Sequence, residues 1–363
     1  MRFPEFSGEW AKTKLGDIGT TLIGLTYSPK DVVPSGGTIV LRSSNIKGGL
    51  TDYNDIVRVN KKIKESIITR VDDLLICARN GSARLIGKNA ILKQEDCGHT
   101  FGAFMMVYRA QNNKFVHQLL NTKRYYAQVG ENLGARINQI TTSDLNSFEF
   151  YFPQTLNEQN KVASMLSLLD ERIATQIKII EKLESLIKGL CQKLTQQGNP
   201  NTTLNEALVC YSSTLQESSV QEAGDYPVYG ATGVCGYTDA PEVDGDSILI
   251  IKDGASVGVT YYASGRYSAI GTLNRLVAKR GYSLRYLYYC LKVFNFAPYR
   301  TGLAIPHIYF RDYGKAKVWC PSLDEQQRIA DALSKVEQKI AIEKSLLEQL
   351  YSQKRFLLQA MFI

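Results

Sequence analysis

The sequence predicts an α+β fold that is built twice. We expect two tandem mixed α/β domains, each followed by a long helix, with the two helices paired as an antiparallel coiled coil around an internal pseudo-twofold axis. Two observations predict this architecture: the chain of 363 residues contains a tandem repeat, and each copy ends in a run of apolar heptads. A repeat of this size fixes the domain organisation before any single element is assigned.

The repeat is clearest in "EQNKVASML", which starts at 158, and "EQQRIADAL", which starts at 325. Twelve of the 37 positions from 158 to 194 are identical in the second copy. Upstream, "DDLLICARNG" at 72–81 resembles "GDSILIIKDG" at 245–254. The chain therefore divides into a first mixed domain at 1–155, a helix at 156–197, a second mixed domain at 198–320 and a helix at 321–363.

In each helical segment, apolar residues recur at alternating steps of four and three, from 162 to 194 and from 329 to 361. Such spacing over about five heptads predicts a supercoiled helix pair. Asn157 and Asp324 are the expected N-caps, and Gly198 and Pro200 are expected to end the first helix. A helix of about 36 residues is about 54 Å long at about 1.5 Å per residue.

Three positions of the apolar seam are polar: Gln176 and Glu343, which occupy the same slot of the repeat, and Lys354. A buried polar residue in a coiled coil can fix the register and orientation of the helices. A tolerated polar residue in a long seam is the alternative.

The mixed domains show short alternating segments broken by Gly, Asn and Asp, which is typical of strands and turns. We expect strands at 37–44, 72–79, 104–109, 246–253 and 272–279. Helices are expected at 114–129 and at 283–296.

Charge is unevenly distributed along the chain, whose formal net charge is +8. Residues 1–157 hold 20 bases and 14 acids, and residues 247–323 hold eleven bases and two acids, whereas 195–246 hold eight acids and no base. Basic surfaces suit a polyanion such as nucleic acid. The start of the chain does not have the pattern of a signal peptide and no apolar run is long enough to span a bilayer, so we expect a cytoplasmic protein. The seven scattered cysteines are expected to be reduced.

Motifs for catalysis are missing from the sequence. Cys97 and His99 form a pair too sparse for a metal site, and no glycine-rich loop has the spacing that binds nucleotides. The segment "PEVDGDSILIIK" lacks the second acid of a nuclease motif, because Ile250 stands in its place. We therefore expect no catalytic residue and no metal, and a self-contained methyltransferase or nuclease fragment is disfavoured.

In combination, these features resemble the DNA specificity subunit of type I restriction–modification systems. The resemblance covers essentially the whole chain. It rests on the two helix entries "FPQTLNEQNKVASML" and "CPSLDEQQRIADAL", on "RFPEFSGEWAKTKLGDI" at the start, on "YPVYGATGVCGYT" at 226–238 and on the paired stretches "LLICARNG" and "ILIIKDGASVG".

The resemblance implies that the two mixed domains are target recognition domains, each reading one half of a split DNA target. It implies that the helices are conserved spacers that bind two methyltransferase subunits, which in turn support the restriction subunit. Adenine methylation would use S-adenosylmethionine on the methyltransferase, and restriction would use ATP and Mg on the restriction subunit. No cofactor is expected on this chain, which would be a non-catalytic specificity subunit.

The helix pair then acts as a ruler between the two half-sites. Half-sites on one face of the duplex lie about one helical turn, roughly 34–36 Å, apart. We expect a spacer of several unread base pairs, with its length set by the helices.

Candidate DNA contacts lie where strands run into turns. Arg79, Asn80 and Gly81 are expected to be equivalent to Lys252, Asp253 and Gly254, and Arg suits guanine while Asn suits adenine. A plain hairpin with a solvated charge is the alternative. The stretch "LRSSN" at 41–45 lies at another strand end and is expected to match "VYGATG" at 228–233. The paired loops "GARINQ" and "GLAIPH" are expected to precede a strand, with packing as the alternative to DNA contact. The residues predicted to contact DNA are Arg42, Ser43, Ser44, Asn45, Arg79, Asn80, Arg84, Lys88, Arg136, Asn138, Tyr229, Thr232, Lys252, Asp253, Arg275, Arg300 and His307.

Ile342 and Leu346 lie outside the strict seam and are candidates for docking a methyltransferase. Packing in a wider seam is the alternative. The competing function for the whole chain is a coiled-coil scaffold whose end domains bind protein or glycan. The salt dependence of DNA binding separates the two, because affinity for DNA falls steeply as salt rises.

Overall fold

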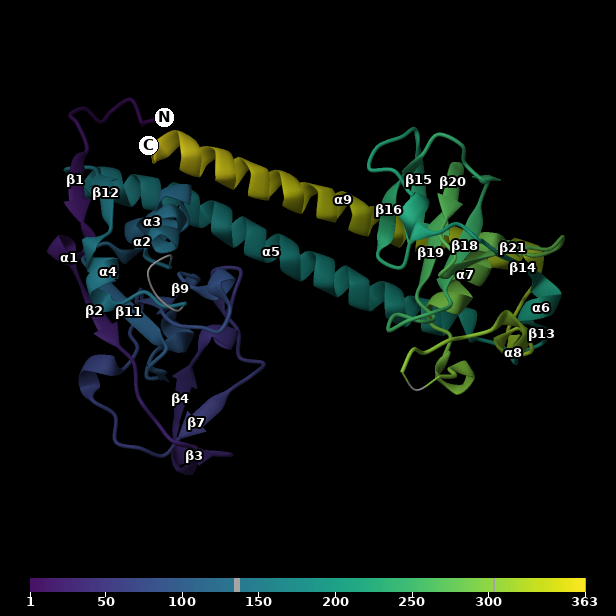
Figure 1. Ribbon diagram of the computed structural model, residues 1–363, viewed down its shortest axis with the longest axis horizontal. Helices are drawn as coiled ribbons and strands as arrows, with labels where there is room; N and C mark the ends of the chain where they lie inside the picture. Colours follow the sequence, from purple (N-terminus) through teal and green to yellow (C-terminus); the bar gives the residue numbers. More distant parts are fainter. Residues whose placement is uncertain (134–137, 303, 363) are drawn as a thin grey trace. The chain divides into compact units, whose positions relative to one another are not determined.

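The computed structural model describes residues 1–133, 138–302 and 304–362 (Figure 1). It divides into two compact units, Met1–Thr175 with Leu347–Ile363, and Gln176–Leu346. We call these unit 1 and unit 2. Each contains one mixed domain together with a part of both long helices. None of the helices described here is long and apolar enough to cross a membrane.

The first mixed domain and the long helix after it contain these elements: β1 (Ala11–Lys14), α1 (Leu15–Ile18), β2 (Gly19–Ile23), β3 (Val32–Val33), β4 (Thr38–Leu41), β5 (Ile46–Lys47), β6 (Leu50–Thr51), β7 (Val57–Val59), β8 (Leu74–Cys77), β9 (Asn89–Ile91), β10 (Thr100–Phe101), β11 (Met105–Ala110), α2 (Asn113–Leu119), α3 (Lys123–Leu133), α4 (Thr142–Ser147), β12 (Glu149–Phe152) and α5 (Leu156–Thr195). Single 3-10 turns include η2 (Ser43–Asn45) and η4 (Ala83–Leu85).

The second mixed domain and its long helix contain β13 (Thr202–Thr203), α6 (Leu204–Ala207), β14 (Leu208–Ser212), β15 (Tyr226–Gly230), β16 (Gly233–Thr238), β17 (Val243–Asp244), β18 (Ser247–Ile251), β19 (Thr260–Ala263), β20 (Arg266–Ala269), β21 (Leu273–Ala278), α7 (Leu284–Lys292), η7 (Ala297–Tyr299), α8 (Phe310–Tyr313), β22 (Lys317–Val318) and α9 (Leu323–Met361). The five strands expected from the sequence are therefore confirmed as β4, β8, β11, β18 and β21.

The two units share one topology. The central antiparallel sheet has the order β2-β11-β8-β9 in unit 1 and β14-β21-β18-β19 in unit 2. Short outer pairs correspond as well, β1 with β12 and β13 with β22. Each unit also has a smaller sheet with one parallel strand pair, β4 with β10 in unit 1 and β15 with β20 in unit 2. The predicted duplication and fold class are thus confirmed by the central sheets, the outer strand pairs and the long helices.

The central strands β8 and β18 are buried on both faces. On one face of β8, Leu74 and Ile76 pack against the helices, including Leu166 of α5 and Leu358 of α9. On the other face, Leu75 and its neighbours pack against the smaller sheet. Unit 2 repeats this layering with β18. Burial on both faces explains why these strands are continuously apolar instead of alternating.

The long helices pair with each other in both units (Figure 1). In unit 1 the ion pair Asp170–Lys354 joins α5 to α9 at 2.5 Å. In unit 2, Lys344 pairs with Glu184 at 2.6 Å. Because residues early in α5 meet residues late in α9, and the reverse, the pairing is antiparallel, as predicted. All ten seam positions of each helix are buried or half-buried, so the heptad assignment is confirmed.

The repeated Glu-Gln motif has a clear structural role. Gln159 Nε2 donates to the carbonyl of Pro153 at 3.0 Å, and Gln326 Nε2 donates to that of Pro321 at 2.9 Å. The other amide atom of Gln326 accepts from the backbone N–H of Ser283, the N-cap of α7, at 2.9 Å. One glutamine therefore joins the start of a long helix to the start of a helix in the mixed domain.

The predicted N-caps Asn157 and Asp324 are wrong. The helices begin earlier, at Leu156 and Leu323, since the backbone N–H groups of the motif glutamates are accepted by Thr155 Oγ1 and Ser322 Oγ, both at 3.3 Å. Thr and Ser are good caps because a short hydroxyl side chain reaches the free N–H groups of the first turn.

The helix expected at 114–129 is two helices, α2 and α3. Thr122 separates them: its hydroxyl donates to the carbonyl of Leu119 at 2.7 Å and accepts from the N–H of Tyr125 at 3.3 Å. This is a hydroxyl that competes with the helical backbone bonds and so favours a break.

A polar junction fastens α2 to the helix pair of unit 1. Gln118 Nε2 donates to Asp170 Oδ2 at 3.1 Å, and the other oxygen of Asp170 pairs with Lys354. His117 is buried beside them, and its Nδ1 has no hydrogen-bond partner among the described residues. Burial, with Lys354 as the next cause, lowers the pKa of His117 to about 4.

Unit 2 has a polar junction at the equivalent place, made of different residues. Glu337, which the repeat aligns with Asp170, accepts from the hydroxyls of Tyr288 and Tyr289 at 3.2 and 2.8 Å and pairs with Lys292 at 2.5 Å. The neutralising cation therefore comes from α7 in unit 2 and from α9 in unit 1. An acid at this position of each long helix holds the mixed domain in both cases.

Candidate nucleic-acid interface

Several predicted contact residues of unit 1 gather where β4 and β8 end. We call this group the first strand-end surface. It consists of Ser43, Arg79, Asn80, Lys88, Phe104 and Asn138.

Hydrogen bonds hold this surface together. Asn80 Nδ2 donates to Ser43 Oγ at 3.0 Å, and Lys88 Nζ reaches the carbonyl of Ser43 at 3.5 Å. Asn138 Nδ2 donates to the carbonyl of Gly81 at 3.0 Å. Asn138 has a φ of 36°, a left-handed conformation that asparagine tolerates better than most residues. The structure thus joins three separate segments of sequence.

Arg79 projects from this surface against an exposed aromatic ring. Its Cζ lies 5.1 Å from the ring centroid of Phe104, whose side chain is 58% exposed. The carbonyl of Phe104 accepts from the N–H groups of both Ala78 and Arg79, each at 3.0 Å. The two side chains are therefore fixed to each other through the backbone as well as through the cation–π contact.

Other candidates of unit 1 fit different roles. Asn45 is 1% exposed, and its amide is used by Arg42 N, Asp52 O and Asp55 O, so it stabilises the turn after β4 instead of facing a ligand. Arg42 itself pairs with Asp55 at 2.7 Å. The exposed residues Ser44 and Arg84 lie in η2 and η4. Arg136 lies outside the described residues.

In unit 2 the corresponding group, the second strand-end surface, consists of Lys252, Asp253, Thr272, His307 and Tyr309. His307 Nδ1 lies 2.7 Å from Asp253 Oδ1, and the imidazole stacks on Tyr309 with ring centroids 6.5 Å apart. The backbone N–H of Lys252 donates to the carbonyl of Thr272 at 3.0 Å. A base, an acid and aromatic rings are thus combined on one half-exposed surface.

The predicted equivalence of Arg79 with Lys252 is wrong by one residue. Ile140 N donates to the carbonyl of Ala78, and its counterpart Ile308 N donates to that of Lys252, both at 2.9 Å. Ala78 therefore matches Lys252, and Arg79 matches Asp253. The loops also lead into the short helices α4 and α8 before any strand, and not directly into strands as the sequence suggested.

The stretches "LRSSN" and "VYGATG" do match at their start, because Leu41 and Tyr229 hold the same place beside a parallel strand. They then diverge. Unit 1 continues through η2 and the hairpin β5–β6, whereas unit 2 turns at once through Thr232 between β15 and β16. The ring of Tyr229 packs edge-on against Tyr267 at 5.5 Å, which fits a packing role.

The two other basic residues of unit 2 that are predicted to contact DNA, Arg275 and Arg300, lie at separate places. Arg275 is half-buried on β21, with its Cζ 4.3 Å from the ring centroid of Tyr211. Arg300 is exposed after η7 and donates to the carbonyl of Val257 at 3.1 Å. Neither makes a contact with the second strand-end surface that the structure records.

The polar seam residues Gln176 and Glu343 contact each other within unit 2. Gln176 Nε2 donates to the carbonyl of Glu343 at 3.0 Å and to its carboxylate, and both side chains are buried. The carboxylate also pairs with Lys339 at 2.5 Å, and this contact, followed by that of Gln176, lowers the pKa of Glu343. Their role in fixing the helix register stays a prediction.

The sequence pattern missed Phe104 and Tyr309. Phe104 was assigned to a strand as one apolar residue among several, yet it lies just before β11 and is exposed. Tyr309 precedes α8 and carries Arg311 over its ring at 4.9 Å. An aromatic residue beside a strand end, next to a base in the folded chain, is the signal that could have found both, and it becomes visible only with the topology.

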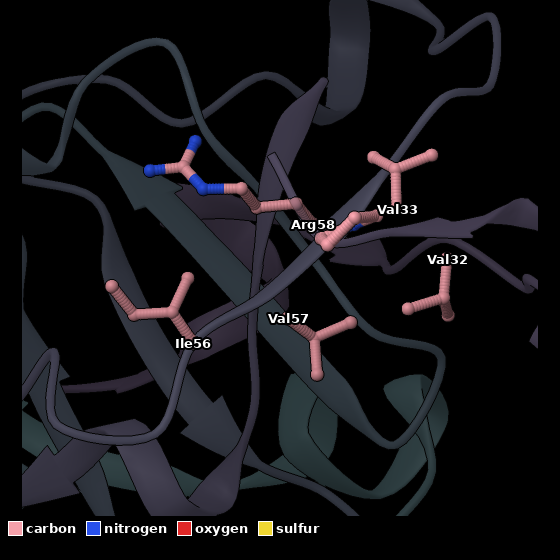
Figure 2. A pocket seen from close by; sticks show the side chains of 6 residues that line it. Val32, Val33, Ile56, Val57 and Arg58 are labelled. Atoms are coloured by element: carbon pink, nitrogen blue, oxygen red, sulfur yellow. The ribbon is translucent and has the colours of Figure 1, made fainter. Parts of the chain in front are cut away.

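No group of three His, Cys, Asp or Glu side chains within the described residues could hold a metal ion. All seven cysteines are free thiols. A shallow hollow lies beside β3 and β7. Figure 2 shows side chains that line it, of which Val32, Val33, Ile56 and Val57 are aliphatic and Arg58 is charged. This lining offers no group for acid–base or nucleophilic chemistry.

Comparison with known proteins covers most of the chain. The family model described as "Type I restriction modification DNA specificity domain" matches residues 7–185 and 211–352. The chain is 25% identical over 197 residues to the specificity subunit of the type I restriction enzyme StySPI from Salmonella potsdam. It is 26% identical over 212 residues to a type I specificity subunit of Mycoplasma genitalium.

These two alignments cover 50% and 53% of this chain. They span 41% and 54% of the relatives, so the chain matches about half the length of each. Among solved structures, the S subunit of a type I restriction–modification system from M. genitalium is similar over 100% of this chain and 99% of that chain, with a TM-score of 0.67 and 19% identity. That likeness shows a shared fold.

Proposed function

Because the chain belongs to the family of type I restriction–modification DNA specificity domains, we propose that it is the DNA-binding specificity subunit of such a complex. In this proposal each mixed domain is a target recognition domain for one half-site of a bipartite target. The base pairs between the half-sites are not read.

One observation carries the proposal: the same fold occurs twice in one chain, and each copy has a strand-end surface of polar and basic side chains. A single DNA-binding domain needs no such duplication. Two half-sites of different sequence do require two domains of one topology with different exposed residues. Arg79 beside Phe104 in unit 1, and Asp253 beside His307 in unit 2, fit that requirement.

The long helices would serve as the spacer. α5 has 40 residues and α9 has 39, so each is about 60 Å long at about 1.5 Å per residue. We propose that their length sets the number of unread base pairs, and that Gln176 and Glu343 fix the helix register.

The chemistry would reside on partner subunits. Two methyltransferase subunits would supply S-adenosylmethionine-dependent adenine methylation, and a restriction subunit would supply the ATP- and Mg-dependent reactions. Ile342 and Leu346, 62% and 37% exposed on α9, are candidates for docking a methyltransferase. This chain itself would be non-catalytic.

Methylome sequencing tests the proposal directly. Cells that express this chain with its neighbouring methyltransferase gene are compared with cells that lack this chain only. A split adenine motif present in the first and absent from the second is the expected result. An unchanged methylome, with complex formation verified, would contradict it.

The scaffold alternative predicts no DNA binding by the complex. Binding of labelled duplex at several salt concentrations separates the two functions. For DNA binding the logarithm of the affinity falls linearly with the logarithm of the salt concentration, because Lys and Arg side chains displace counterions from the phosphates.

A further inference from the structure

The corrected register makes Arg79 and Asp253 the same position in the two units. Both follow a buried central strand by two residues, and the residue before each is placed by matching backbone bonds to Ile140 and Ile308. Their side chains are opposite in charge. A position that keeps its backbone setting while its chemistry is reversed is what a reading position in a duplicated DNA-binding fold requires.

We infer that positions 79 and 253 determine specificity in their respective half-sites, with Arg79 reading a guanine and Asp253 reading the amino group of a cytosine or adenine. This inference rests on the proposed function. The chemistry follows from the base edges: guanine presents two acceptors, O6 and N7, in the major groove, whereas cytosine and adenine present amino donors.

Arg79 is held ready for such a contact. The Phe104 ring, 5.1 Å from its Cζ, restricts the guanidinium without using its N–H donors, and Phe104 is itself placed by the two backbone bonds to its carbonyl. A planar guanidinium matches the two acceptors of guanine in a fixed bidentate geometry, whereas a lysine ammonium reaches them as a flexible point charge. Phe104 is therefore a positioning residue for Arg79.

Asp253 is held by a different neighbour. His307 Nδ1 pairs with its Oδ1 at 2.7 Å, and the imidazole is in turn stacked on Tyr309. A carboxylate has two oxygens and about four acceptor sites, so this pair leaves capacity for an amino group. His307 is thus the positioning residue of unit 2, as Phe104 is in unit 1.

The test is methylome sequencing of the complete complex with Arg79→Lys, Arg79→Ala, Phe104→Leu and Asp253→Asn. We expect Arg79→Ala to lower the preference for guanine at a single position of one half-site by roughly 10- to 100-fold, and Arg79→Lys to lower it less. Asp253→Asn should change only the other half-site. Phe104→Leu should weaken discrimination at the same guanine as Arg79→Ala, which a merely structural role would not do.

Arg124→Ala is the matched control. Arg124 also lies over an exposed aromatic ring, with its Cζ 5.3 Å from the centroid of Tyr151, but at the first turn of α3 beside β12. It should leave the motif unchanged. Thermal unfolding of each complex separates loss of folding from loss of reading.

Two outcomes overturn the inference while the proposed function stands. In the first, Arg79→Lys and Arg79→Ala leave a wild-type motif intact. In the second, Arg79→Ala lowers methylation of all sites equally and reduces the salt slope of binding by about 1, which marks a phosphate contact. If the wild-type complex has no motif that depends on this chain, the proposed function itself fails.

Discussion

His117 should make unit 1 sensitive to mild acid. Burial lowers its pKa to about 4, below the value of 6.5 expected in an unfolded chain. The unfolded state therefore binds more protons between these two values, and the free energy of unfolding rises with pH through this window. Above about pH 6.5 His117 is neutral in both states and does not lower the free energy of unfolding. As the pH falls from 6.5 towards 4, protonation of His117 in the unfolded state progressively lowers it. A pKa difference of about 2.5 corresponds to roughly 3 kcal/mol.

Urea unfolding between pH 4 and pH 7.5 measures this effect in the wild type and in His117→Phe. A Trp319→Phe background leaves Trp10 as the single tryptophan. Trp10 packs against Phe115 with ring centroids 6.2 Å apart, so its fluorescence reports on unit 1. His117→Gln, which keeps a polar side chain, provides a second variant if Phe disturbs packing. Both variants should lose less stability on acidification than the wild type.

Asp170 and Lys354 remain beside position 117 in every variant, so the proteins compared differ only in the side chain at this position. Equal losses of stability in the wild type and both variants would refute the reasoning, because the protonation of His117 would then not be linked to unfolding. A loss that is larger in the variants would contradict the sign.

Three further predictions concern packing and thiol access. Leu166→Ala, at a fully buried seam position, should lower the free energy of unfolding by about 2–5 kcal/mol in urea titration, whereas Leu168→Ala at a 61% exposed position should change it by less than about 0.5 kcal/mol. Gly198→Ala should lower the free energy of unfolding of unit 2 by about 1–3 kcal/mol in the same assay, because the new Cβ would lie 2.2 Å from the indole of Trp319. Gly189→Ala, in open space on α5, should leave it unchanged or raise it. A larger loss of stability in Gly189→Ala than in Gly198→Ala would contradict both predictions. Burial raises the pKa of the Cys290 thiol, so iodoacetamide at pH 8 should alkylate it only after denaturation. Mass spectrometry measures the alkylation, and alkylated Cys290 in the native sample would contradict the prediction.

The duplication and the helix pair could be predicted from sequence because both depend on periodicity. The seam positions at 162–194 and 329–361 follow from the spacing of their apolar residues, and the polar Gln176, Glu343 and Lys354 fall at the same spacing. The N-caps were missed because a cap is decided by where the backbone leaves the helix, and Thr155 lies before the first residue that the heptads indicate.

The candidate site was predictable only in part. The sequence located the strand ends but made Lys252 the counterpart of Arg79. The most similar residues of the two turns align one position away from the register that the hydrogen bonds define. Asn45 was chosen as a polar residue near a turn, and only the folded chain shows that its amide is used internally. Phe104 was missed for the opposite reason, since nothing local distinguishes an exposed apolar residue from a buried one.

The glutamine that joins each long helix to its mixed domain has a consequence for how such chains can change. In unit 2 the amide of Gln326 binds a backbone carbonyl and a backbone N–H, and neither depends on the side chain at Pro321 or Ser283. A different domain that begins its helix at the same place would meet the same two backbone atoms. Under the proposed function, the joint of unit 2 would therefore tolerate exchange of the domain it holds, whereas in unit 1 the amide of Gln159 accepts from the side chain of Asn112 at 3.5 Å and depends on that residue.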